Sequence, residues 1–262
     1  MTAEEKILLS NLEEKAAKCD NLNMITCSAF LDMHEKSLAT AVKAPLGVTR
    51  VFYGGFDGAE RNMAVFMPEY TYVKTEQDAV NYFAENPEDC PLRILKISKD
   101  KFSKPLGHRD YLGAVMGLGI NRNVTGDILV NDGGCLMAVT EGMAEYIADN
   151  LDKAGRGTLK IEIMLPSQVE KSTKAQGTPV SFTVSSPRLD SIIKNCFGVS
   201  RTGASEAIEH GLVFVNDVEC LKPDRRINEG DKIVMRHKGR LIINDLGSIS
   251  KKGRVIVKAT QF

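Results

Sequence analysis

The sequence is poor in several residue types. It contains no tryptophan, only 6% aromatic residues and only four histidines in 262 residues. Its six cysteines include no Cys-x-x-Cys pair, so neither a zinc knuckle nor a disulfide framework is indicated. No stretch approaches the roughly 18 uninterrupted apolar residues of a membrane helix, and the N-terminus is acidic where a secretory signal is basic. These absences favour a reduced, cytoplasmic protein, and no cofactor is expected.

Charge is balanced over the chain but distributed unevenly. Lys and Arg number 34, as do Asp and Glu, so the formal net charge is zero. Residues 185–262 carry 14 basic and 9 acidic side chains, whereas residues 1–184 carry 20 and 25. The basic excess is greatest over residues 222–262, with 11 against 4. A basic C-terminal module joined to a more acidic body indicates a polyanionic partner.

The chain is expected to be an α+β protein in which residues 1–90 form a mixed α/β region. Hydrophobic residues make up 43% of the chain, an ordinary share for a globular protein. Apolar residues one turn apart predict helices over residues 4–19, 28–43 and 77–84. Two strands, 48–55 and 61–68, flank a glycine-rich turn.

Residues 91–166 are predicted to form a central domain of order β-α-β-β-α-β. The strands are expected at residues 92–99, 126–132, 134–140 and 157–165, and the helices at 109–118 and 141–154. This order is typical of ferredoxin-like and RNA-recognition-motif folds. Residues 167–185 are interpreted as a polar linker followed by a strand.

Residues 186–262 are predicted to begin with two short helices and to continue into a small sheet that carries basic residues. Ser186-Pro187 is expected to cap the first helix, whose apolar stripe runs from Leu189 to Phe197. Ser200 is expected to cap the second helix. This segment resembles the alpha-L (S-four-type) RNA-binding domain. The matching residues are Arg188-Leu189-Asp190, Ser200-Arg201, Gly211-x-Val213-x-Val215-Asn216, Lys222-Pro223 and Gly230-Asp231-x-Ile233.

The chain from about residue 30 onward resembles the bacterial YlmH-type RNA-binding proteins. The residues that carry this likeness are Tyr53-Gly54-Gly55-Phe56, Ala59-Glu60-Arg61, His108 to Gly113, Leu118-Gly119-Ile120-x-Arg122, Gly126-Asp127-Ile128 and Ser250 to Arg254. The resemblance implies a non-enzymatic factor that binds ribosomal RNA and tRNA, on the large ribosomal subunit. Members of the family that it resembles are associated with the rescue of stalled nascent chains and with cell-division gene clusters.

The candidate RNA-binding residues are cations and hydroxyls of the C-terminal module. Structured RNA is recognised through its backbone, and guanidinium, ammonium and hydroxyl groups are suited to phosphate oxygens. Arg201 has the added advantage of opening a helix, where backbone N–H groups favour an anion. The full set is Arg188, Ser200, Arg201, Thr202, Lys222, Arg225, Arg226, Arg236, Lys238 and Arg240.

The sequence leaves several alternatives open. Arg188 and Asp190 form either a structural ion pair or part of the RNA contact. His108 to Gly113 is either the start of a packed helix, with Arg109 and Asp110 paired, or a contact with RNA or a partner. The whole protein is alternatively an RNA-modifying enzyme with its active site in residues 1–165, or an adaptor that links a protein to RNA. A pocket around His108, Asp110 and Glu60 would favour the enzyme.

Overall fold

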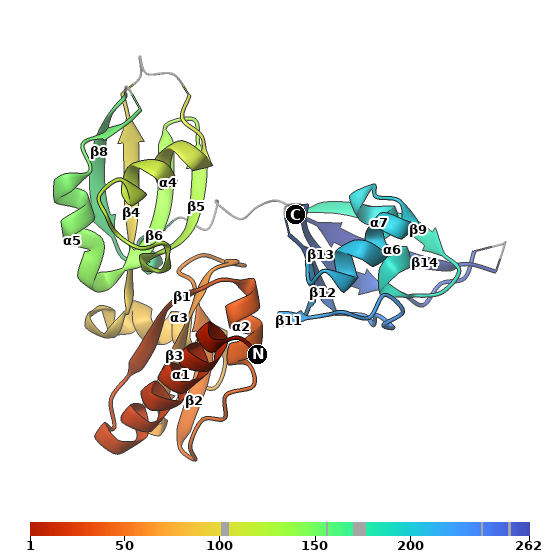
Figure 1. The fold of residues 1–262 in the computed structure, drawn as a ribbon, viewed down its shortest axis with the longest axis horizontal. Coiled ribbons are helices and arrows are strands. Elements are labelled where there is room, and N and C mark those ends of the chain that lie inside the picture. Colours follow the sequence, from red (N-terminus) through yellow and green to blue (C-terminus); the bar gives the residue numbers. More distant parts are fainter. Residues whose placement is uncertain (101–104, 156, 170–176, 237, 251–252) are drawn as a thin grey trace. The chain divides into compact units, whose positions relative to one another are not determined.

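The computed structural model describes residues 1–100, 105–155, 157–169, 177–236, 238–250 and 253–262. The chain divides into two compact units, residues 1–173 and residues 174–262 (Figure 1). No helix within the described ranges is both long and apolar enough to cross a membrane. The division of the first unit into an N-terminal region, residues 1–90, and a central domain, residues 91–166, stays a prediction.

The first unit contains two sheets. Three strands in the order β1-β3-β2 form one sheet, and five in the order β5-β6-β4-β8-β7 form the other. The elements are α1 (Ala3–Leu22), β1 (Thr26–Leu31), α2 (Met33–Ala39), β2 (Val48–Tyr53), β3 (Asn62–Pro68), α3 (Glu76–Glu85), β4 (Leu92–Lys99), α4 (His108–Met116), β5 (Thr125–Asn131), β6 (Gly134–Thr140), α5 (Glu141–Asn150), β7 (Lys153–Ala154) and β8 (Gly157–Met164).

The five-stranded sheet has the expected ferredoxin-like arrangement. Strand β4 pairs antiparallel with both β6 and β8, and β5 pairs with β6 at the edge. Helices α4 and α5 cover one face, where Leu95, Ile97 and Met137 are buried with Tyr111 and Ile147. The predicted central β-α-β-β-α-β order is therefore correct.

Two helix predictions in this unit are wrong in part. Residues 28–31 belong to strand β1, which pairs with β3, and the helix begins only at Met33. Asp32 ends the strand and caps the helix: its Oδ1 accepts a hydrogen bond from the Glu35 N–H, and Glu35 Oε2 accepts one from the Asp32 N–H. Helix α5 ends at Asn150 and not at Ala154, because Lys153 and Ala154 turn back to pair with strand β8.

The second unit packs two helices on one face of a six-stranded sheet of order β11-β10-β12-β13-β14-β9 (Figure 1). Its helices carry the predicted apolar stripe, with Leu189, Ile192 and Ile193 fully buried. The elements are β9 (Thr178–Val184), α6 (Leu189–Phe197), α7 (Arg201–Glu209), β10 (Val213–Val215), β11 (Val218–Glu219), β12 (Lys232–Met235), β13 (Gly239–Asp245) and β14 (Val255–Gln261).

Strand β9 is an edge strand of this sheet. All seven of its residues pair antiparallel with β14, from Val184 opposite Val255 to Thr178 opposite Gln261. The basic C-terminal extension is thus folded into the sheet as β13 and β14. This pairing makes neighbours of β9, which precedes helices α6 and α7 in the chain, and β14, which follows them.

Candidate nucleic-acid interface

The start of helix α6 is fixed by the loop that precedes β12. The Leu189 N–H donates to the Arg225 carbonyl and the Asp190 N–H to the Pro223 carbonyl, each at 2.9 Å. Arg188 pairs with Arg226 in an isolated antiparallel bridge, so the chain is still extended there. Arg188, and not Ser186, is therefore the N-cap residue of α6. The expected Ser186 cap is wrong because partners across the loop satisfy the first N–H groups of the helix.

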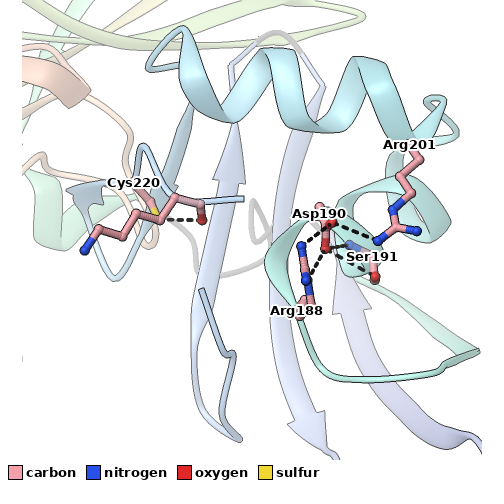
Figure 2. A network of polar contacts seen from close by, with 6 residues as sticks. Arg188, Asp190, Ser191, Arg201 and Cys220 are labelled. Carbon is pink, nitrogen blue, oxygen red and sulfur yellow. Dashed lines mark hydrogen bonds and ion pairs between the residues drawn. The ribbon is translucent and has the colours of Figure 1, made fainter. Parts of the chain in front are cut away.

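Asp190 is the centre of a buried polar network at this point (Figure 2). Its side chain is only 2% exposed. It accepts hydrogen bonds from Arg188 Nε at 3.2 Å and Nη2 at 3.0 Å, and from the Ser191 N–H at 2.7 Å and hydroxyl at 3.2 Å. Arg201 Nη2 lies 3.6 Å from Asp190 Oδ2. The ion pair between Arg188 and Asp190 is thus confirmed, whereas an RNA contact of Arg188 stays a prediction. The carboxylate also pairs with a second guanidinium, that of Arg201.

The two arginines are anchored at one end and accessible at the other. The side chain of Arg201 is 67% exposed and that of Arg188 is 40% exposed. A carboxylate behind a guanidinium fixes its direction and leaves its remaining N–H groups for an acceptor in solvent. Asp190 is therefore buried behind the two cations and pairs with both.

Helix α7 begins as the sequence predicts. The Ser200 hydroxyl oxygen accepts a hydrogen bond from the Gly203 N–H at 2.9 Å, which makes Ser200 the N-cap. Ser200, Arg201 and Thr202 are all exposed. The first turn of the helix, whose N–H groups have no intrahelical acceptor, thus carries an arginine and two hydroxyls at the surface.

The ten predicted residues lie in two groups. The larger group comes from the starts of α6 and α7 and from the loop Lys222–Arg226, whose main chain is hydrogen-bonded to the start of α6. We call this group the helix-start cluster, and it comprises Arg188, Ser200, Arg201, Thr202, Lys222, Arg225 and Arg226.

The smaller group lies at the connection between β12 and β13. The guanidinium carbon of Arg236 lies 5.4 Å from the centre of the Phe214 ring, and that of Arg240 lies 4.4 Å from the centre of the Phe262 ring. These distances are typical of cation–π contacts, and the RNA-binding role predicted for both arginines stays a prediction. Lys238, between them in sequence, is exposed.

Sequence reasoning missed two cations near the helix-start cluster. Lys194 lies one helical turn after Asp190, so its i+4 spacing on the same helix was a usable signal. Arg254 comes from the segment before β14, and only the pairing of β14 with β9 brings it near Val184. Lys251 and Lys252, part of the same family-like segment, lie outside the described residues.

Two of the residues named for an enzyme in the first unit, Asp110 and Glu60, make structural contacts, Glu60 through its backbone N–H. The Asp110 carboxylate accepts the Gly107 N–H at 2.7 Å and so caps α4, and the Glu60 N–H donates to Asp127 Oδ2 at 2.7 Å. Burial lowers the pKa of His108, and the positive charge of Arg122 lowers it further. Among the described residues, no group of three or more His, Cys, Asp and Glu side chains could hold a metal ion.

The family-like residues around Arg61 join the two sheets of the first unit. Arg61 Nε donates to the Thr125 carbonyl and its Nη2 to the Phe30 carbonyl, each at 3.1 Å. Asp127 accepts the Arg61 N–H at 3.1 Å. Burial lowers the pKa of Arg61, and nearby carboxylates, Asp127 among them, oppose that effect. These residues serve the assembly of the unit.

The face of the central sheet that is not covered by α4 and α5 is itself partly buried. Leu92 and Ile94 of β4 and Ala138 of β6 pack against Phe30 and Tyr53 of the N-terminal region. RNA-recognition motifs use aromatic side chains on this face to stack bases. In this chain, the aliphatic side chains of Leu92, Ile94 and Ala138 occupy this face and pack against the three-stranded sheet.

Comparison with known proteins agrees with the resemblance drawn from the sequence. The model of the putative RNA-binding domain in YlmH matches residues 86–168, and that of the S4 domain matches residues 187–233. The chain is 30% identical over 227 residues to the ribosome-associated protein quality control protein P2 of Bacillus subtilis (strain 168), over 86% of this chain and 82% of that protein. The solved structure of the cell division protein ylmH from Streptococcus pneumoniae is also similar. Its identity is 18% and its TM-score 0.49, with 65% of this chain and 97% of that chain covered.

The S4 match contains both helices of the second unit and the whole helix-start cluster. The two domain models follow one another in the order expected from the sequence, and the Bacillus relative aligns over most of both chains. The chain therefore belongs to the YlmH-type family of RNA-binding proteins, with an S4 domain in its C-terminal unit.

Proposed function

We propose that this protein binds structured ribosomal RNA and tRNA through the helix-start cluster and acts by binding alone, without catalysis. The observation that carries the proposal is the buried Asp190 carboxylate, which holds Arg188 and Arg201 with their outer faces exposed. Cations that are already oriented lose little conformational entropy when they meet a phosphate. Such a surface suits the backbone of folded RNA, whose base edges are hidden in a deep, narrow groove.

The name of the Bacillus relative supports a role in ribosome-associated protein quality control. We further propose that the protein works in the cytoplasm on the large ribosomal subunit, where rRNA and tRNA are both accessible. Sequencing of RNA crosslinked to the protein in cells tests this finer proposal. Enrichment of large-subunit rRNA and tRNA supports it, and recovery of unrelated messenger RNA contradicts it.

The binding surface is tested by the double variant Arg201→Ala/Arg225→Ala in the full chain. Each lost phosphate contact removes about 0.7–0.9 from the slope of log affinity against log salt. Two lost contacts then lower the affinity for a structured rRNA fragment by about 30-fold at roughly 0.1 M salt, relative to a 1 M reference. Filter-binding titrations at several salt concentrations measure both quantities.

The matched control is Lys6→Ala/Lys18→Ala, which removes two exposed cations from α1 in the first unit. This control is expected to leave RNA affinity nearly unchanged, and circular dichroism checks that both variants are folded. An unaltered affinity and slope in the Arg201→Ala/Arg225→Ala variant would refute the proposed surface.

A further inference from the structure

A small hollow in the second unit gathers three cations from three separate elements. Its volume is about 100 Å³, and its polar lining comprises Ser185, Ser191, Lys194, Asn195, Arg201 and Arg254. Lys194 comes from α6, Arg201 opens α7 and Arg254 precedes β14. Among the described residues that line the hollow, none carries a carboxylate.

Contacts to the main chain and to Asp190 hold two of these cations in place. Arg254 Nη2 donates to the Thr183 carbonyl of β9 at 2.9 Å, and its backbone N–H donates to the Ser250 hydroxyl oxygen at 3.1 Å. Arg201 Nη2 lies 3.6 Å from Asp190 Oδ2. The guanidinium groups are therefore oriented before any ligand arrives.

The chemistry of the lining selects an oxyanion. Asp190 offsets part of the charge of Arg201, but three positive side chains around one small hollow still exceed this single carboxylate and favour a further negative group between them. Among the neutral lining groups, the Ser191 hydroxyl already donates to Asp190 Oδ1, and the Asn195 amide donates one hydrogen to the Ser191 carbonyl. The Ser185 hydroxyl and the second amide hydrogen of Asn195 are the further neutral donors of the lining. A phosphodiester, whose two non-bridging oxygens share one negative charge, can accept from these donors and from the three cations.

We propose that this hollow seats one backbone phosphate of the bound RNA, with Arg254 and Lys194 as contacts added to Arg201. This inference rests on the proposed function. The S4 match ends at residue 233, so Arg254 lies outside the matched segment and is supplied by the extension that forms β13 and β14. The extension therefore enlarges the RNA-binding surface beyond the two helices and the loop of the S4 domain.

The test compares Arg254→Gln and Lys194→Gln with the wild-type full chain in RNA titrations from about 0.05 to 0.3 M salt. Each variant is expected to lose about 0.7–0.9 of the salt slope and about sixfold in affinity near 0.1 M salt, relative to a 1 M reference. Arg254→Lys keeps the charge and is expected to recover most of the slope. Thermal melting checks that loss of the bond to Thr183 leaves the unit folded.

The matched control is Lys258→Gln, which removes one positive charge from β14 at a side chain paired with Asp245 outside the hollow. It is expected to retain the wild-type slope. If Arg254→Gln and Lys194→Gln also retain the wild-type salt slope, the hollow does not bind a phosphate of the RNA. The proposed function survives this result as long as Arg201→Ala/Arg225→Ala loses RNA affinity. If wild-type protein binds no structured RNA, the proposed function itself fails.

A separate titration with inorganic phosphate alone distinguishes a free anion from an RNA phosphate. A single phosphate in an open hollow gains little without the rest of the RNA, so saturation is expected only above the millimolar range. Micromolar binding of inorganic phosphate that is lost in Arg254→Gln would assign the hollow to a free anion and overturn the proposal.

Discussion

Replacing Asp190 by asparagine is expected to weaken RNA binding even though it removes a negative charge beside the cluster. Asparagine keeps one oxygen but places an NH2 group where Oδ2 now faces Arg188 and Arg201. Both guanidinium groups then lose their charged anchor and become free to reorient. Simple charge counting predicts the opposite result, because RNA is repelled by a carboxylate.

The magnitude follows from the contacts of the carboxylate. Hydrogen bonds to charged groups contribute about 1.5–3 kcal/mol to stability, and the exposure of both arginines reduces that contribution. Asp190→Asn is therefore expected to lower the free energy of unfolding by about 1–2 kcal/mol. A unit of this size loses roughly 4–8 °C in Tm for each kcal/mol. Ordering two freed side chains on binding costs roughly 1–2 kcal/mol more, or about tenfold in RNA affinity.

Filter binding and thermal melting measure the two effects in the same variant. Asp224→Asn is the matched control, since Asp224 is an exposed carboxylate in the loop that carries Lys222, Arg225 and Arg226. It removes the same charge and is expected to bind RNA as well as, or slightly better than, the wild type. If Asp190→Asn binds as tightly as Asp224→Asn, Asp190 does not position the arginines and the reasoning is refuted.

Three further predictions concern the packing of the molecule. In Gly126→Ala the new Cβ would lie 2.6 Å from Cε1 of Phe30, so a loss of about 1–3 kcal/mol in unfolding free energy is expected. Gly113→Ala, on helix α4, is expected instead to raise the Tm, because its new Cβ would meet nothing within 4 Å. If both variants melted at the wild-type temperature, both predictions would be contradicted. Burial raises the pKa of the Cys196 thiol to about 11 and that of Cys135 to about 12. Since only the thiolate reacts, alkylation of Cys196 and Cys135 in the folded protein at pH 8 is expected to be slower by on the order of a hundredfold or more than in urea. Equal rates at these two residues, measured by mass spectrometry of the labelled peptides, would contradict this.

Much of the fold was predictable because its signals are local. The alternation of apolar and basic residues over Leu92–Lys99 and the stripe from Leu189 to Phe197 depend only on neighbouring residues, and both elements were found. The errors came from contacts between distant segments. Residues 28–31 have helical spacing, yet their pairing with β3 makes them a strand.

The candidate site shows the same division. The sequence indicated Arg188 and Arg201 and left the role of Asp190 open, and the structure explains how the three side chains act together. The sequence did not indicate that Arg254 and Lys194 line the same hollow, because this requires the long-range pairing of β14 with β9. Cation–π contacts to Phe214 and Phe262 likewise depend on tertiary packing.

Ultraviolet crosslinking of the full chain to structured RNA, followed by mass spectrometry of the RNA-linked peptides, tests the central claim most directly. Adducts are predicted on peptides that contain residues 188–202 and 222–226, with a further adduct near Arg254. Adducts confined to the first unit, on residues 1–169, would place RNA binding elsewhere and contradict the account.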